Sequence, residues 1–335
     1  MRKLQLDDLS KELGYSKTLI SMVLNGKGNQ YGISKKTQAL VLDTAARLNY
    51  TPNKFAKSLR TGKSYFIGLI VSDISNPFYS TIAKRVESIL FESGYNLMVC
   101  STDENEEREK LLVDMMVNQQ GVDGLIISSV LQNAEFYEHA RFSKTPMVFI
   151  DRVVPLHKAN YVLIDNYGGA LSLVNQLIKQ NCKKIACFAI TPLHLSTIED
   201  RLNGYRKAIQ NAGINSDPAL IRSIRFMSMT EDVEQELRGF METKTIPDAI
   251  FVLNNHLAVV LLKLIKTKQY SVFENVKIAC FDDIELFNII DKPVTSLAQP
   301  MDAIGKVAVD KLMATLAGNQ LTTSSEVLPT QLIER

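Results

Sequence analysis

Short, unbroken apolar runs alternate with helical segments from residue 66 to residue 281, and this alternation constrains the fold most strongly. A strand that is apolar along its whole length is buried on both faces, which is typical of parallel sheets covered by helices. About 270 residues are too many for one such core, so the pattern predicts two α/β lobes. The apolar runs lie at 66–71, 96–100, 125–127, 147–150, 185–190, 249–253 and 276–281. The helical segments lie at 79–93, 106–119, 134–142, 168–179, 199–212, 231–241 and 257–266.

Residues 9–26 carry the features of two short helices joined by a tight turn. Gly14 can adopt the positive φ that ends the first helix, and the Ser16 hydroxyl can cap the second. Helical spacing separates residues 17–24 into an apolar face and a polar face, and the polar face comprises Lys17, Thr18, Ser21 and Met22. These features predict a helix-turn-helix, with an ordinary helical hairpin as the alternative on this stretch alone.

A third helix is expected after Ser34, and it would complete an all-α bundle of about 50 residues. Its expected buried stripe consists of Val41, Leu42, Ala45 and Leu48. The following residues, 52–60, are too short to form a helix that is stable by itself in water. We therefore interpret residues 52–62 as a linker that orders only when something holds it.

Charge is divided unevenly along the chain. Residues 1–63 hold 12 Lys and Arg against 4 Asp and Glu, a net charge of +8, and the total of +2 leaves −6 for residues 64–335. A basic head on an acidic body is typical of a module that binds a polyanion such as DNA. A solvated basic surface is the alternative, but the positive excess coincides with the predicted helix-turn-helix.

Several classes of protein are not expected. The first residues contain no apolar run of signal-peptide length and no stretch approaches 18 apolar residues, so we expect a soluble, cytoplasmic protein with no membrane partner. The four cysteines show no metal-ligand spacing, which predicts reduced thiols with no metal site and no cofactor. Motifs for dinucleotides, phosphate loops and serine nucleophiles are missing, so we do not expect an enzyme.

Eight motifs, in order along the chain, resemble those of the lactose/galactose-repressor (LacI/GalR) family of bacterial transcription regulators. They are YSKTLISMVLNG at 15–26, LNYTPN at 48–53, AKSLRTG at 56–62, IGLIVSDISNPF at 67–78, GVDGLI at 121–126, VFIDR at 148–152, RLNGY at 201–205 and FDD at 281–283. The resemblance covers essentially the whole chain. It implies a helix-turn-helix head, a hinge helix and an α/β two-lobed body like that of periplasmic binding proteins, with parallel sheets and helices on both faces.

The resemblance also implies domain boundaries. The DNA-binding domain would span residues 1–51, the hinge 52–62, and the effector-binding and dimerisation domain 63–335. Lobe 1 would comprise about 63–164 and 293–321, and lobe 2 about 165–290 and 322–335. The chain would then cross between the lobes near 163–166, 290–293 and 320–323.

For the head, the resemblance implies contacts with an operator. The second helix would offer Lys17, Thr18, Ser21 and Met22 to the major groove, where base-pair edges are distinguishable, while Ser16, Ser21 and Asn25 would meet phosphates. Met22 departs from the family, which usually carries a basic or polar residue there, so the half-site sequence does not follow by analogy. In the hinge, Asn53, Ala56 and Leu59 would contact DNA. A homodimer would present two such heads to a pseudo-palindrome.

For the body, the expected effector site lies at the carboxyl ends of the strands, where open α/β sheets bind their ligands. Carboxylates, amides and an arginine beside an aromatic ring suit the hydroxyls of a sugar or sugar derivative. Asn254-Asn255 departs from the Asn-Asp common in the family, which leaves the identity of the effector open. The residues predicted to bind it are Asp73, Asn76, Phe78, Asp151, Arg152, Arg201, Asn254 and Asp282.

The sequence therefore predicts a DNA-binding transcriptional regulator, a repressor, whose operator affinity is controlled by a carbohydrate effector bound between two lobes. The alternative is a solute-binding receptor of the periplasmic type with no DNA role. That alternative leaves the basic head unexplained.

The role expected for Leu59 can be tested by substitution. In the family this leucine is inserted between base pairs in the minor groove, which unstacks them and bends the DNA. We expect Leu59→Ala to weaken binding to the operator while leaving non-specific DNA binding nearly intact, in a gel-shift titration of both DNAs. Equal loss on both DNAs would instead favour the alternative, in which Leu59 and Phe55 dock the linker on the body.

Overall fold

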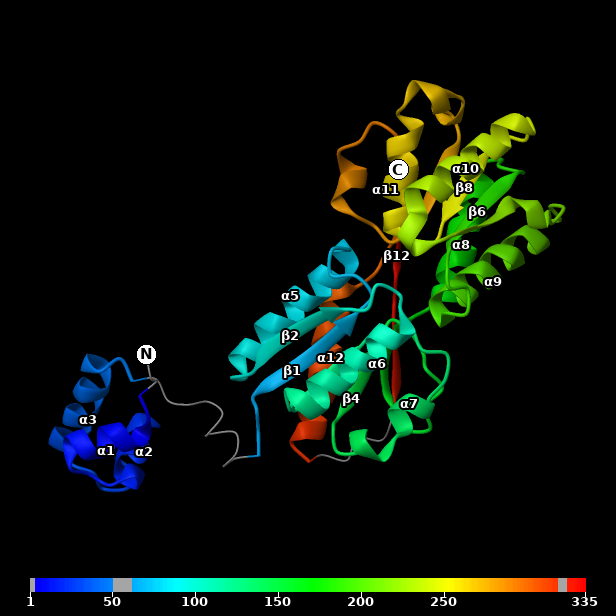
Figure 1. Cartoon of the computed structure of the whole chain (residues 1–335). Helices are drawn as coiled ribbons and strands as arrows, with labels where there is room; N and C mark the ends of the chain where they lie inside the picture. Colours follow the sequence, from blue (N-terminus) through cyan, green and yellow to red (C-terminus); the bar gives the residue numbers. More distant parts are fainter. Residues whose placement is uncertain (1–3, 51–61, 319–323) are drawn as a thin grey trace. The chain divides into compact units, whose positions relative to one another are not determined.

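The computed structural model describes residues 4–50, 62–318 and 324–335. The chain forms two compact units, Met1–Ser64 and Tyr65–Arg335, which we call the head and the body. Figure 1 shows the helices of the head and the helices and strands of the body. Each unit has a hydrophobic core of its own.

Within residues 4–50, the described part of the head, three helices form a bundle: α1 Leu6–Leu13, α2 Lys17–Leu24 and α3 Lys35–Arg47. Both predicted turn signals are confirmed: Gly14 ends α1 at a φ of 69°, and the Ser16 hydroxyl accepts a hydrogen bond from Leu19 N at 3.2 Å. The tight turn therefore follows from local chemistry.

The core of the head draws one or two residues from each helix, and its fully buried members are Leu9, Ile20, Val23, Val41 and Ala45. The stripe predicted on α3 is wrong at Leu42, which is 49% exposed. Helical spacing places Leu42 at the edge of the stripe, and the position of α1 and α2 leaves that edge open to solvent.

Two six-stranded sheets form the body, which confirms the two predicted α/β lobes. The first sheet has the order β11-β5-β4-β3-β1-β2 and the second β12-β10-β9-β8-β6-β7. All pairings are parallel except β10 with β12. The strands of the first sheet are β1 Phe66–Val71, β2 Asn96–Ser101, β3 Gly124–Ile127, β4 Met147–Ile150, β5 Asn160–Ile164 and β11 Ser325–Leu328. Those of the second are β6 Ile185–Ile190, β7 Ile221–Ile224, β8 Ala249–Val252, β9 Lys277–Phe281, β10 Val294–Ala298 and β12 Gln331–Ile333.

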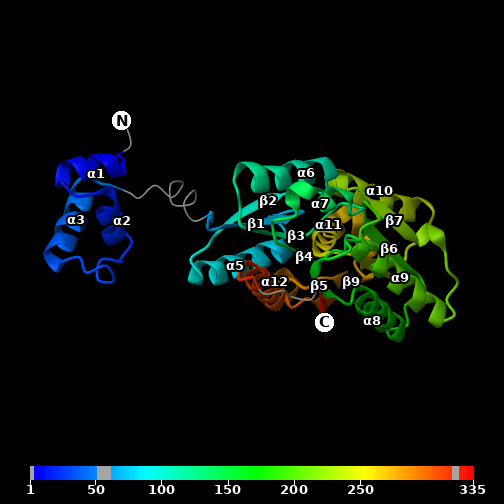
Figure 2. The same cartoon turned by 90° about the horizontal axis from the view of Figure 1, so that it is seen from below.

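Helices cover both faces of each sheet (Figure 2). In lobe 1, defined by the first sheet, α5 and α12 pack together on one face, and α6 with the π-helical Met115–Gln119 lies on the other. In lobe 2, defined by the second sheet, α8 packs with α9 and α10 with α11. The helices of lobe 1 are α5 Pro77–Glu92, α6 Glu106–Asp114, α7 Glu135–Glu138 and α12 Met301–Leu316. Those of lobe 2 are α8 Asn166–Lys179, α9 Ser196–Asn211, α10 Met229–Glu242 and α11 Asn255–Ile265.

Alternation along β1 shows why its sequence is apolar throughout. Ile67, Leu69 and Val71 point into the core beneath α5, whereas Ile70 points into the opposite core with Met116. Each of these side chains is fully buried, so the strand has no solvent face.

Several elements were not predicted, and most of the strands among them lack a continuous apolar run. In β10, Thr295 and Ser296 are buried polar residues, and β11 and β12 are short and largely exposed. Helix α12 and strands β5 and β7 were also missed. The segment 106–119, predicted as one helix, is α6 followed by the π-helical turn.

Two of the predicted lobe crossings are corrected. Strand β10 belongs to the second sheet, so the second crossing lies at residues 299–300 and not at 290–293. Strand β11 belongs to the first sheet and β12 to the second, so the third crossing lies at 329–330 and not at 320–323. The sequence could not indicate these positions because the partner strand, and not the strand's own composition, assigns each strand to a lobe.

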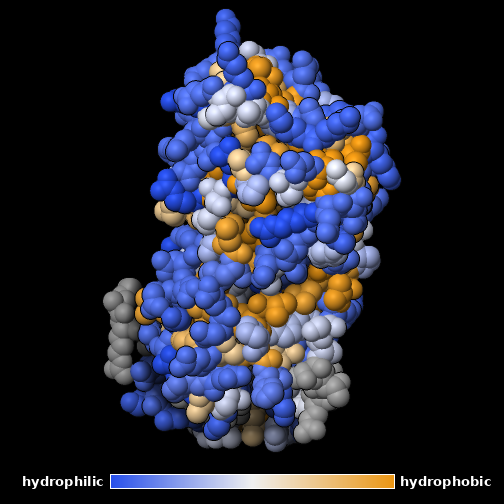
Figure 3. Space-filling model, turned by 90° about the vertical axis from the view of Figure 1, so that its right-hand side faces the viewer, coloured by the Kyte–Doolittle hydropathy of each residue, from blue (hydrophilic) through white to orange (hydrophobic). Residues whose placement is uncertain are grey.

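Hydrophilic residues cover most of the face shown in Figure 3, and hydrophobic residues gather there only in separate strips. Across the described residues, no helix combines the length and apolar character needed to span a bilayer. All four cysteines are free, and Cys182, Cys187 and Cys280 are buried.

Helices α8 and α9 approach closely at Gly204, and this contact is testable. A Cβ at residue 204 would press against the backbone of Tyr167 and lie 2.9 Å from the Ala170 Cβ. We expect Gly204→Ala to lower the free energy of unfolding by about 1–3 kcal/mol, because the helices must separate. Gly239 in α10 has open space around it, so Gly239→Ala should raise stability by about 0.5–1 kcal/mol. Urea unfolding of both variants checks the contrast, and equal effects would contradict the close approach.

Candidate functional site

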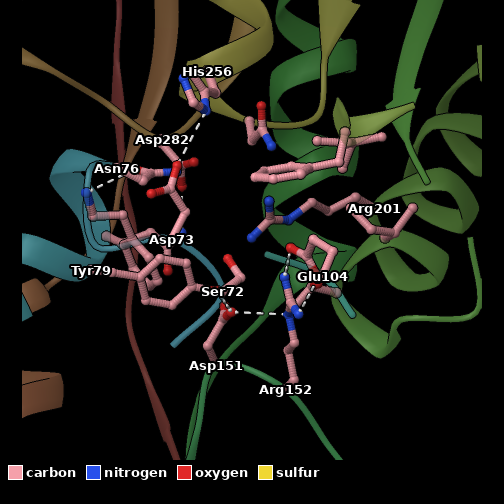
Figure 4. A pocket seen from close by; sticks show the side chains of 17 residues that line it. Ser72, Asp73, Asn76, Tyr79, Glu104, Asp151, Arg152, Arg201, His256 and Asp282 are labelled. Carbon is pink, nitrogen blue, oxygen red and sulfur yellow. Dashed lines mark hydrogen bonds and ion pairs between the residues drawn. The ribbon is translucent and has the colours of Figure 1, made fainter. Parts of the chain in front are cut away.

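A cleft between the two lobes gathers side chains from the carboxyl ends of the parallel strands (Figure 4). Lobe 1 contributes the segments after β1, β2 and β4, and lobe 2 those after β8, β9 and β10, with α9 at one side. The cleft encloses about 500 Å³, its mouth included. All eight residues predicted to bind the effector line it, namely Asp73, Asn76, Phe78, Asp151, Arg152, Arg201, Asn254 and Asp282.

Nine further residues line the cleft and were not predicted. Ser72 and Glu104 follow β1 and β2, so the rule that placed Asp73 could have found them. Gln299 follows β10, which was not recognised as a strand. His256 also lines the cleft, where its side chain is 41% exposed and its Nδ1 lies 3.9 Å from Asp73 Oδ2. The others are Tyr79, Ile190, Thr197, Ile198 and Phe226.

Asp151 and Arg152 form a buried polar corner with Glu104. The Arg152 Nη1 and Nη2 donate to the two carboxylate oxygens of Glu104 at 2.7 and 2.6 Å, a bidentate pair. Arg152 Nε lies 3.5 Å from Asp151 Oδ2. Each of the three side chains is only 6–7% exposed, so water screens these charges little.

Tyr79 also contacts the carboxylate of Asp151. Its hydroxyl donates to Asp151 Oδ2 at 2.9 Å and lies 3.0 Å from Ser128 Oγ. Burial raises the pKa of the Tyr79 hydroxyl, which keeps it protonated as a donor. Asp151 itself has a φ of 65°, a conformation that L residues rarely adopt and that its partners hold in place.

Arg201 is anchored from lobe 2 by neutral groups. Its Nε donates to Asn166 Oδ1 at 2.8 Å and its Nη1 to the Leu253 carbonyl at 2.6 Å. The guanidinium carbon lies 3.7 Å from the centroid of the Phe281 ring, in a cation–π contact. Two of its nitrogens are therefore occupied by the protein, and the group is pre-oriented at the cleft.

Asp282 is the most perturbed carboxyl of the cleft. Burial raises its pKa to about 6, while the field of Arg201 and a hydrogen bond from Gln299 act in the opposite direction. Its Oδ2 also accepts from Asn255 N at 3.3 Å. A carboxylate held in this way can accept hydrogen bonds from ligand hydroxyls near neutral pH.

Direct contacts join the lobes beside the cleft. Asn255 Nδ2 at the start of α11 donates to Asn76 Oδ1 at 2.9 Å, and Val153 N donates to Ser196 Oγ at 2.9 Å. The departure from the family at Asn255 thus lies in a bond between lobes. Its Oδ1 is buried without a hydrogen-bond partner.

The head presents most of its predicted DNA-binding residues to solvent. Ser16, Lys17, Thr18 and Asn25 are exposed, whereas Ser21 and Met22 are half-buried. Lys17 forms an ion pair with Asp7 of α1, and Asn25 Nδ2 donates to the Ser21 carbonyl at 2.7 Å, which caps α2. Asn53, Ala56 and Leu59 lie outside the described residues.

These features define a class: a regulator with a helix-turn-helix head and a two-lobed, ligand-binding body. A family described as a periplasmic binding protein-like domain matches residues 174–335, and one described as a protein of unknown function (DUF3769) matches residues 70–226.

Known relatives extend the match over both units. The HTH-type transcriptional regulator DegA of Bacillus subtilis is 29% identical over 99% of this chain and 97% of its own length. The ribose operon repressor of Halalkalibacterium halodurans is 29% identical over 98% and 95%. A crystal structure of the Lac repressor bound to ONPG in the repressed state covers 100% of this chain and 99% of its own, at 25% identity and a TM-score of 0.83. Over essentially its whole length, the chain is therefore similar to transcription regulators of the LacI family.

The raised pKa of Asp282 predicts a characteristic pH dependence of stability. An unfolded aspartate has a pKa of about 3.9, so the native state binds more protons than the unfolded state between about pH 4 and pH 6. The free energy of unfolding of the wild type, relative to Asp282→Asn, should therefore fall by up to about 3 kcal/mol as the pH rises through this window. Above the window the difference should be level. Urea unfolding across the range checks this, and curves that stay parallel would show that the carboxyl is not perturbed.

Proposed function

We propose that this chain is a sequence-specific DNA-binding repressor whose operator affinity is controlled by a sugar or sugar derivative bound in the cleft. The observation that carries the proposal is the convergence of eight polar and aromatic side chains from both lobes on one cleft, in a chain that also has a helix-turn-helix head. The head would bind the operator, and the cleft would bind the effector that controls this binding.

The residues proposed to contact the DNA bases lie in the first turn of α2. Lys17 and Thr18 are exposed there, where the major groove offers guanine acceptors and the thymine methyl group. The Lys17–Asp7 ion pair does not prevent this role, because both side chains are about half exposed and such pairs contribute little to stability. Lys17 can exchange the carboxylate for a base edge or a phosphate.

Carbohydrate binding follows from the mixture of donors and acceptors in the cleft. Asp73, Asp151 and Asp282 accept from hydroxyls, Arg201 donates, and Phe78 offers a ring. One relative is named a ribose operon repressor, and the Lac repressor structure contains ONPG. Both support a sugar or sugar derivative here.

Control of DNA binding requires that the ligand favours one arrangement of the lobes. A ligand touching Asp73 and Asn254 adds to the hydrogen bond that already joins Asn76 and Asn255 across the cleft. By linkage, the factor by which the ligand changes operator affinity equals the factor by which the operator changes ligand affinity. We therefore propose that closure of the lobes seats or unseats the heads.

A homodimer forms part of the proposal, because two-fold pairing of heads matches a pseudo-palindromic operator. Lobe 2 carries an apolar surface suited to a second copy of the chain. Ile289 is 80% exposed there, beside a groove lined by Val259, Leu262, Leu286 and Ile290. Exposed apolar groups of this kind mark interaction surfaces.

The receptor and enzyme alternatives have less support. The aligned relatives cover the head as well as the body, and they are named as regulators or repressors. A receptor without a DNA role gives the basic head no function.

Selection from a random pool of DNA duplexes by the full chain, followed by titration of the enriched sequence, tests the proposal. We expect a pseudo-palindromic site, bound more tightly than a scrambled duplex. Lys17→Ala should weaken the selected site by about 1–3 kcal/mol and relax the base preference at one position. Lys36→Ala, on exposed α3, is the matched control and should affect both duplexes equally.

The same titrations with a panel of sugars test the control by ligand. At least one sugar should change operator affinity, and Asp73→Asn in the cleft should remove that response while preserving DNA binding. Enrichment of no sequence would contradict the DNA-binding role. A response that survives unchanged in Asp73→Asn would place the effector elsewhere.

A further inference from the structure

The charges that line the cleft narrow the chemistry of its ligand. Four carboxyl groups face two guanidinium groups, a net charge of −2 when all the carboxyls are ionised and His256 is neutral. The carboxyl groups are those of Asp73, Glu104, Asp151 and Asp282, and the guanidinium groups those of Arg152 and Arg201.

Arg152 is the cation best placed to bind an acidic ligand, but Glu104 already occupies it. Both terminal nitrogens of Arg152 donate to Glu104, and the remaining Nε lies 3.5 Å from Asp151 Oδ2, close enough for an ion pair but without a hydrogen bond. Bidentate arginine–carboxylate pairs are among the strongest charged hydrogen bonds in proteins. A ligand carboxylate or phosphate would have to displace Glu104, which is 7% exposed, and leave its charge buried and unpaired.

The backbone places Glu104 for this pairing. Asp103 and Glu104 both have positive φ, 53° and 57°, directly after β2. The side chain of Glu104 points toward Arg152 across the base of the cleft (Figure 4).

Arg201 does not provide an anion-binding site in place of Arg152. Its hydrogen bonds anchor it to Asn166 and Leu253, and its charge acts on the buried Asp282, whose pKa it lowers. Among the described residues of the cleft, Arg152 pairs with the carboxylates of Glu104 and Asp151. The charge of Arg201 acts on the carboxylate of Asp282.

We infer that Glu104 is a specificity-determining residue, which neutralises Arg152 so that the cleft selects sugars without a carboxylate or phosphate group. The inference rests on the proposed function and narrows its ligand class. Hydroxyl groups find acceptors in the carboxylates and a donor in the Asn254 amide, whereas an anion meets a negative lining and an arginine already paired with Glu104. Rejection of the wrong ligand by an unfavourable charge is a general route to specificity.

Matched sugars that differ only in charge test the inference on the full-length wild-type chain. The probes are glucose with glucuronate and glucose 6-phosphate, galactose with galacturonate, and ribose with ribose 5-phosphate, each measured by thermal shift and calorimetry. We expect the uncharged member of at least one set to bind at least about tenfold more tightly than its acidic partners. Preference for an acidic member overturns the inference and leaves the proposed function standing. If no probe binds and none changes operator affinity, both fail.

Substitution of Glu104 then tests its own role in the discrimination against acidic sugars. Glu104→Gln frees Arg152 with little change in shape, and it should reduce the discrimination against acidic sugars by about tenfold or more. Glu104→Asp keeps the charge and should keep most of the discrimination. Glu107→Gln, on exposed α6, is the matched control and should match the wild type. Unchanged discrimination in Glu104→Gln overturns the role of Glu104, and the wild-type sets decide the ligand class even if this variant does not fold.

Discussion

The chain passes between the two lobes three times, and this tethering determines where a ligand can act. The crossings follow β5, β10 and β11, at or just beyond the carboxyl ends of those strands. The loops that carry the polar residues of the cleft leave the sheets at the same ends, so hinge and cleft share one edge of each sheet. Any change in the angle between the lobes therefore opens or closes the cleft directly, with no need for a longer path of coupling.

Within the cleft, charge burial is the second constraint. Asp151, Arg152 and Glu104 lie together in a poorly hydrated corner in which both carboxylates pair with the arginine, so removal of one partner leaves an uncompensated charge. Asp282 has no ion-pair partner within 4 Å among the described residues, and its pKa is raised because burial disfavours the charged carboxylate. The cleft thus holds one fully paired corner and one carboxyl whose charge remains available to a ligand. In this arrangement, the residues that determine which ligands are accepted can differ from the residues through which a bound ligand acts.

Much of the fold and of the site could be predicted from local patterns. The continuous apolar runs indicated strands with both faces buried, and the end-of-strand rule located seven residues of one cleft although they are distant in the sequence. The eighth predicted residue, Arg201, came from the RLNGY motif of the family resemblance. Glu104 and Gln299 were missed for different reasons. Glu104 follows β2, so the end-of-strand rule could have found it, but it stands among several other acidic residues. Gln299 follows β10, in which the polar Thr295 and Ser296 interrupt the apolar run by which strands were predicted.

The sequence by itself determined the elements whose causes are local. Gly14 and Ser16 set the turn of the head, continuous apolar runs indicated seven of the twelve described strands, and helical spacing indicated most of the helices. Only the tertiary structure decided which lobe β10, β11 and β12 join, and that Glu104 rather than a ligand occupies Arg152. The physical reason is that strand pairing and ion pairing depend on partners distant in sequence, and no local pattern records them.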